Sequence, residues 1–115
     1  MNQNRFNAII ILDAIPAGEF NTARRLKEEL DDIAAYTIQG LRVLYFRIET
    51  MMDLERCLRD AEQKLHDSGL QPLLHLEGHG LTDESGFVLA RGEHCSWSKL
   101  KCFASVGNGL SSHLS

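Results

Sequence analysis

A histidine between two glycines is the residue of this sequence with the clearest capacity for chemistry. His79 follows the apolar segment 73–77, and Gly78 and Gly80 stand on either side of it. An imidazole can accept a proton near neutral pH, which suits it to act as a general base. Gly80 has no Cβ, so a substrate carbonyl can approach its backbone N–H. We therefore predict a catalytic role for His79 and Gly80.

The alternative for His79 is a purely structural role, which is the usual role of a lone histidine. Its position favours a site, because active sites in open α/β sheets lie beyond the carboxyl ends of parallel strands. Asp13 and Glu19 follow an earlier predicted strand, 8–12, and would lie on the same rim. They are candidates for an acidic pocket that binds a basic substrate side chain. The alternative for these two is a turn residue and a solvated charge.

A metal or phosphate site is not expected. His75 and His79 have a spacing that would suit zinc on a helix. The segment around them is predicted to be a strand, on which residues four apart lie about 13 Å from each other. A phosphate-binding loop would need several glycines after the strand 8–12, and only Gly18 is there. We expect neither a metal nor a cofactor.

The three cysteines are predicted to be reduced thiols. Cys57, Cys95 and Cys102 make an odd number and have no disulfide-framework spacing. A catalytic cysteine needs a lowered pKa and a base within hydrogen-bonding distance. The surroundings of Cys95, in a predicted hairpin, and of Cys102, in a predicted helix, offer neither condition clearly.

Strands and helices alternate over the first two thirds of the chain. A β-branched run predicts a strand that is buried on both faces, and apolar residues at helical spacing predict the helices. The expected order is strand 8–12, a helix over 23–34, strand 41–48, a helix over 51–65 and strand 73–77. This order implies parallel strands joined by helical crossovers. We predict a three-layer α/β fold with a short parallel sheet and flanking helices.

The chain after Gly80 differs in character. Segments 87–90 and 93–95 predict a small hairpin, and a last helix is expected from Ser96. Residues 105–115 are small and polar, and we expect a tail without a further strand. Strand 73–77 would then be an exposed sheet edge, which is a template for association.

Composition limits the kind of protein this can be. The chain has 115 residues, 43% of them hydrophobic and 24% charged, with a net charge of -4. These values are typical of one globular domain. There is no basic run longer than Arg24-Arg25, so nucleic-acid binding is not expected. The N-terminus lacks a signal-peptide pattern, and the run 8–12 is too short to span a membrane. We expect a cytoplasmic protein.

Three segments together resemble the caspase-like clan of cysteine peptidases, in particular its bacterial CHAT-type domains. They are residues 74–80, 86–93 and 96–100, within a resemblance that spans about residues 6 to 104. The resemblance implies that His79 is the catalytic base and that Gly80 supplies one N–H of an oxyanion hole. It also implies a nucleophilic cysteine at the end of a fourth strand.

Two functional hypotheses follow. The resemblance implies a partial caspase-like domain over 1–104 and a polar tail over 105–115, which contains no cysteine. The chain would be a fragment or subunit of a cysteine endopeptidase that lacks the nucleophile and is inactive alone. Its partners would be a protein or peptide, with a complementing chain or self-association possible. The alternative is a non-enzymatic interaction module that pairs through an exposed sheet edge.

Overall fold

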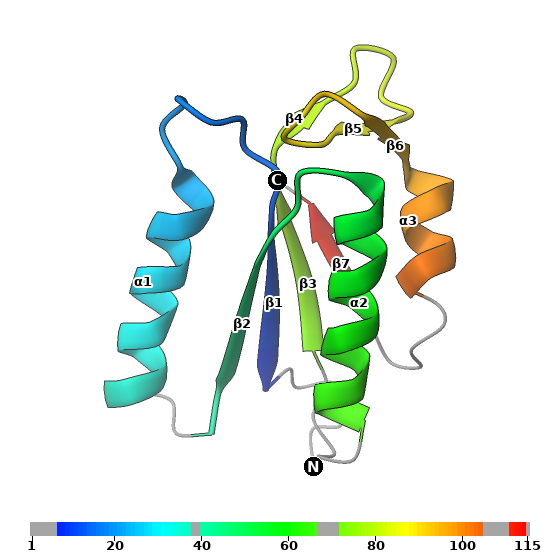
Figure 1. Cartoon of the computed structure of the whole chain (residues 1–115). Coiled ribbons are helices and arrows are strands. Elements are labelled where there is room, and N and C mark those ends of the chain that lie inside the picture. The colour runs from blue at the N-terminus through cyan, green and yellow to red at the C-terminus, as the bar shows by residue number, and fades with distance from the viewer. Residues whose placement is uncertain (1–6, 38–39, 67–71, 105–110, 115) are drawn as a thin grey trace.

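The computed structural model describes residues 7–37, 40–66, 72–104 and 111–114. A parallel sheet lies between helices, and a small antiparallel sheet lies beyond one end of it (Figure 1). The predicted fold class, α/β with a short parallel sheet and flanking helices, is confirmed.

The larger sheet has four parallel strands in the order β2-β1-β3-β7. The strands are β1 (Ala8–Asp13), β2 (Arg42–Arg47), β3 (Pro72–Glu77) and β7 (Ser111–Leu114). In this register Asp13 is level with Arg47 on one side and with Glu77 on the other. Because the three strands run in the same direction, they deliver three charged residues to one end of the sheet.

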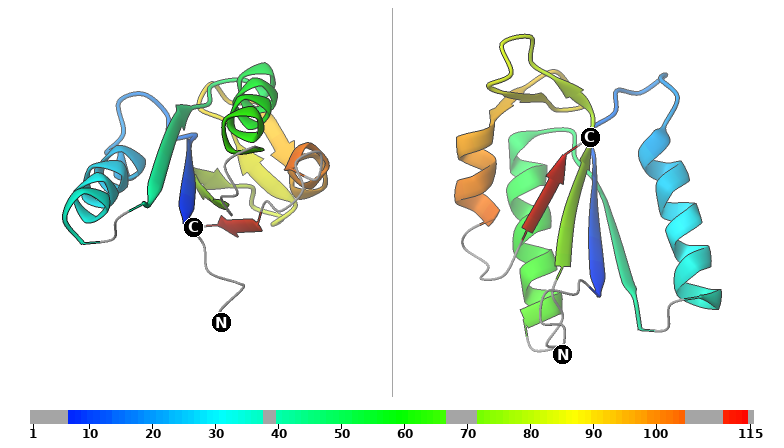
Figure 2. Two further views of the ribbon diagram at one scale, coloured as in Figure 1. Left: turned by 90° about the horizontal axis from the view of Figure 1, so that it is seen from below. Right: turned by 180° about the vertical axis from the view of Figure 1, so that it is seen from behind.

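Helices cover both faces of the sheet (Figure 2). Helix α1 (Thr22–Tyr36) packs on one face, and α2 (Met51–His66) and α3 (Trp97–Ala104) pack on the other. Successive side chains of a strand point to opposite faces, so β1 supplies both cores. Ile10 and Leu12 are buried with α2, whereas Ile11 is buried with α1. Within the described ranges, none of the helices has the length and apolar character needed to cross a membrane.

Side-chain caps fix where the first two helices begin. The side-chain oxygen of Asn21 accepts the Arg24 N–H at 2.8 Å, which caps α1. At α2, the Thr50 hydroxyl accepts the Asp53 N–H at 3.2 Å, and Asp53 accepts the Thr50 N–H at 3.2 Å. This reciprocal arrangement is a capping box.

The small sheet consists of β4 (His79–Gly80), β5 (Gly86–Val88) and β6 (His94–Ser96), in the order β4-β5-β6. All its pairs are antiparallel, so the predicted hairpin is confirmed. The rings of Phe87 and Trp97 stack with centroids 5.3 Å apart, which joins this sheet to α3. The small sheet therefore holds His79 and Gly80 at the carboxyl end of the parallel sheet (Figure 1).

The prediction that no strand follows the last helix is wrong for residues 111–114. They form β7, which pairs with β3 from Leu73 to Leu76. Strand β3 is therefore not a sheet edge. The alternative hypothesis, an interaction module that pairs through the edge of this strand, has no free edge on β3 to use. Backbone hydrogen bonds alone can add a strand, so a polar segment can pair where apolar content predicts none. The rest of the predicted tail, 105–110 and residue 115, lies outside the described residues.

Candidate active site

His79 is paired with Glu19 at the carboxyl end of the parallel sheet. The imidazole Nε2 lies 2.7 Å from Glu19 Oε1, and the two side chains are 59% and 48% exposed. Glu19 comes from the segment between β1 and α1, so the structure brings together two residues that the sequence placed on one rim. A carboxylate that holds one ring nitrogen orients the imidazole and leaves Nδ1 as the nitrogen that can act on a substrate or nucleophile.

The backbone N–H of Gly80 points away from its neighbouring strand. Gly80 is opposite Phe87, while Leu81 N–H donates to the Gly86 carbonyl at 2.9 Å. In an antiparallel pair, bonded and non-bonded positions alternate, so Gly80 and Phe87 do not exchange backbone hydrogen bonds. Since β4 is an outer strand of the small sheet, the Gly80 N–H is directed to its outer side. This is the direction in which an oxyanion donor would have to point.

Asp13 does not form an acidic pocket with Glu19. Its side chain is 0% exposed, and it is surrounded by hydrogen-bond donors. The donors are the backbone N–H of Ile15 at 3.0 Å, Asn21 Nδ2 at 2.8 Å, Arg47 Nη1 at 2.9 Å and the Tyr45 hydroxyl. A carboxylate held in this way has no open position for a basic substrate side chain. Glu19 faces His79 instead.

The donors around Asp13 keep its carboxylate ionised although it is buried. Burial by itself would raise the pKa of Asp13, but hydrogen bonds from Tyr45, Asn21 and Ile15 and the charge of Arg47 together lower it. The same contact acts in the opposite direction on Tyr45. Burial, followed by the hydrogen bond to Asp13, raises the pKa of that phenol. The pair is therefore a phenol donating to a carboxylate.

Sequence reasoning missed Tyr45 and Arg47 as partners of Asp13. They lie 32 and 34 positions away along the chain. The signal that could have identified them is the register of two parallel strands, which sets Arg47 level with Asp13. A second pair was also missed, in which His75 Nε2 lies 2.8 Å from Glu77 Oε1. The Thr22 hydroxyl donates to Glu77 Oε2 at 2.8 Å, so this pair ties the first turn of α1 to β3.

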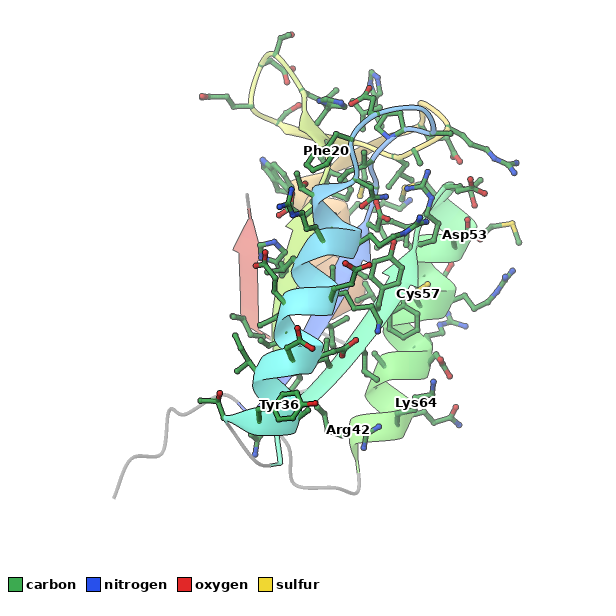
Figure 3. All side chains as sticks on the ribbon, turned by 90° about the vertical axis from the view of Figure 1, so that its left-hand side faces the viewer. Phe20, Tyr36, Arg42, Asp53, Cys57 and Lys64 are labelled. Atoms are coloured by element: carbon green, nitrogen blue, oxygen red, sulfur yellow. The ribbon has the colours of Figure 1, made fainter. Side chains whose placement is uncertain are left out.

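The native thiols that the structure describes are not placed as nucleophiles. Cys95 is buried in the core, and its burial raises the pKa of its thiol. Burial, with the charges of Asp53 and Asp60, raises the pKa of Cys57 to about 11. Figure 3 shows Cys57 on α2, at a distance from the Phe20 end of α1, where the segment carrying Glu19 joins the helix. The side chain of Cys102 lies outside the described residues.

No metal site is evident among the residues whose side chains are described, because no three His, Cys, Asp or Glu side chains are grouped to bind an ion. Comparison with known proteins adds no identification: no family model matches the chain, and no curated protein sequence matches it.

Proposed function

We propose that this chain is the base-bearing part of a caspase-like cysteine endopeptidase. The observation that carries the proposal is the His79–Glu19 pair directly beyond β3, in a sheet where β7 lies beside β3. In the clan that the sequence resembles, the strand beside strand three carries the nucleophilic cysteine at its end. The order of the strands supports the proposal independently of the resemblance in His-Gly.

In this proposal His79 and Gly80 take the roles that the resemblance implies, and the contact with Glu19 supports the role of His79. His79 takes the proton of a thiol, the thiolate attacks the scissile carbonyl carbon, and the Gly80 N–H donates to the oxyanion. The imidazolium then gives its proton to the leaving amine, and water hydrolyses the thioester. Glu19 holds the imidazole through Nε2 during both proton transfers. In this proposal Glu19 orients the base and does not bind the substrate.

In this proposal a second chain supplies the thiol. Cys57 and Cys95 have raised pKa values, and no cysteine is present in β7. A Cys–His pair without its thiol cannot perform covalent catalysis. We therefore expect the chain alone to cleave no peptide, and its partner to be a complementing chain that supplies the thiol.

A peptide-directed thiol probe tests this proposal on the purified chain. The expected result is no labelling that depends on His79, when the intact chain is compared with His79→Ala. His94→Ala is the matched control, since His94 is an exposed histidine of the same small sheet. Labelling of Cys95 that is lost in His79→Ala but retained in His94→Ala would contradict the claim that the nucleophile is supplied from elsewhere.

A further inference from the structure

The segment that carries Glu19 is held at both of its ends by Asp13. This segment, residues 14–21, joins β1 to α1. At its start, the Ile15 N–H donates to Asp13 Oδ1 at 3.0 Å. At its end, Asn21 Nδ2 donates to Asp13 Oδ2 at 2.8 Å. One buried carboxylate therefore closes the loop.

Strand β2 fixes the carboxylate that closes the loop. Arg47 Nη1 donates to Asp13 Oδ1 at 2.9 Å, and the Tyr45 hydroxyl donates to Oδ2. Each carboxylate oxygen therefore accepts one hydrogen bond from the loop and one from β2. Charge-assisted hydrogen bonds of this kind are about twice as strong as neutral ones. The position of the loop is thereby tied to the position of β2 in the sheet.

Contacts inside the loop carry this constraint to Glu19. The Glu19 N–H donates to the Pro16 carbonyl at 3.3 Å, which closes a turn that Gly18 permits with a φ of 89°. Near the start of the loop, the Ala14 N–H donates to the Glu77 carbonyl at 2.8 Å. The loop is therefore also anchored to β3, the strand that leads to the histidine.

We infer that Asp13 is a positioning residue for His79: it fixes the loop so that the Glu19 carboxylate reaches Nε2 of the imidazole. The inference rests on the proposed role of His79 as the base, because positioning matters only if that imidazole reacts. Asp13 itself contacts neither a reacting group nor the histidine. It acts through Ile15 and Asn21 on Glu19.

The test compares the NMR signals of the His79 ring at one fixed pH. Glu19→Gln defines the signals of a ring that has lost its carboxylate partner. Asp13→Asn replaces one carboxylate oxygen by an amide N–H₂ group, which cannot accept a hydrogen bond. At least one of the donors around position 13 therefore loses its acceptor. We expect the ring signals of Asp13→Asn to move at least half of the way to those of Glu19→Gln. Signals that stay at their wild-type values in a folded Asp13→Asn would overturn the inference.

Two further variants keep the test decisive. Asn21→Ser keeps a good helix cap but removes the side-chain N–H₂ that reaches Asp13, so it should shift the ring signals even if Asp13→Asn does not fold. Ring signals that keep their wild-type values in Asn21→Ser would count against the positioning role of Asp13. Asp53→Asn is the matched control, since Asp53 also accepts backbone N–H groups at a helix start, but at α2. It should leave the ring signals unchanged, and an equal shift there would mean that any loss of stability moves them.

The ring signals can be measured without any peptidase chemistry, so the two proposals can fail separately. If the ring signals shift in Asp13→Asn but the reactivity of a cysteine introduced as Ser115→Cys does not depend on His79, the positioning role of Asp13 stands and the peptidase proposal fails. If the reactivity of that cysteine depends on His79 but the ring signals do not shift in Asp13→Asn, the peptidase proposal stands and the positioning role fails.

Discussion

At the scale of single residues, two carboxylates fix the positions of the groups that they contact. Glu19 is exposed and holds an imidazole, whereas Asp13 is buried and holds a loop. Asp13 ends β1 and Glu19 lies in the loop that follows it, so one stretch of chain supplies two carboxylates with different roles. A buried carboxylate is stable as an anion only when donors surround it, and Asp13 satisfies this condition.

The lowered pKa of Asp13 predicts a specific dependence of stability on pH. Its folded pKa lies below the ordinary value of 3.8, so the unfolded chain takes up this proton first as the pH falls. The stability that Asp13 contributes is therefore complete above about pH 5 and is lost progressively below about pH 4. Asp13→Asn should cost about 2 kcal/mol at pH 7, because a buried donor loses its acceptor, and less as the pH falls, measured by urea unfolding. A difference that stays constant down to pH 2.5 would contradict this role of the carboxylate.

The raised pKa of Cys57 predicts a slow thiol. With a pKa of about 11, little of it is thiolate at pH 8. We expect Ellman's reagent to modify Cys57 on the order of 10-fold or more slowly in the folded chain than in the urea-unfolded chain. Mass spectrometry of the modified peptide identifies the site. Equal rates in the two states would mean that burial does not protect this thiol.

At the scale of elements, the small antiparallel sheet sets the position of His79. Residues His79 and Gly80 form one of its outer strands, and Gly86 lies in its middle strand. A Cβ on Gly86 would lie 2.0 Å from the Cys95 carbonyl oxygen, whereas one on Gly80 would have only an ordinary contact of 3.9 Å with the Gly86 oxygen. Packing therefore requires glycine at position 86 but not at position 80.

Two matched substitutions separate these roles of glycine. Gly86→Ala should destabilise the chain by about 3 kcal/mol, because the carbonyl that it meets belongs to the paired strand and cannot move aside. Gly80→Ala should change the free energy of unfolding by less than about 0.5 kcal/mol. Thermal or urea unfolding measures both. If both variants lost the same stability, the close pairing of β5 with β6 would be wrong.

Local patterns predicted most of the elements, and long-range pairing accounts for what they missed. The β-branched run of β1, the capping box at Thr50 and the turn at Gly92 are all visible within a few residues. Strand β7 was missed because its pairing with β3 depends on backbone hydrogen bonds and not on an apolar pattern. The role of Asp13 was missed because its partners on β2 lie more than 30 positions away. Sequence alternation predicts which face a residue takes, but not which distant donor it meets.

At the scale of the whole molecule, the order of the strands sets β7 beside β3, the strand that leads to His79. Leu114, the last residue of β7, is paired with Leu76, three positions before His79. The residue that follows β7 in the chain is Ser115. In the clan that the sequence resembles, the nucleophilic cysteine lies at the end of the fourth strand. We therefore predict that the reactivity of a thiol at position 115 depends on His79.

The reactivity of Ser115→Cys tests the proposed pairing of a thiol with His79. Mass spectrometry measures the rate at which iodoacetamide alkylates the introduced cysteine at pH 6.5. This rate should be about 10-fold higher in Ser115→Cys than in the double variant Ser115→Cys, His79→Ala, because a neighbouring imidazole raises the thiolate fraction. In the control double variant Ser115→Cys, His94→Ala, the rate should equal that of Ser115→Cys. If the introduced thiol reacts at the same rate with and without His79, the structure does not hold the base half of a Cys–His pair.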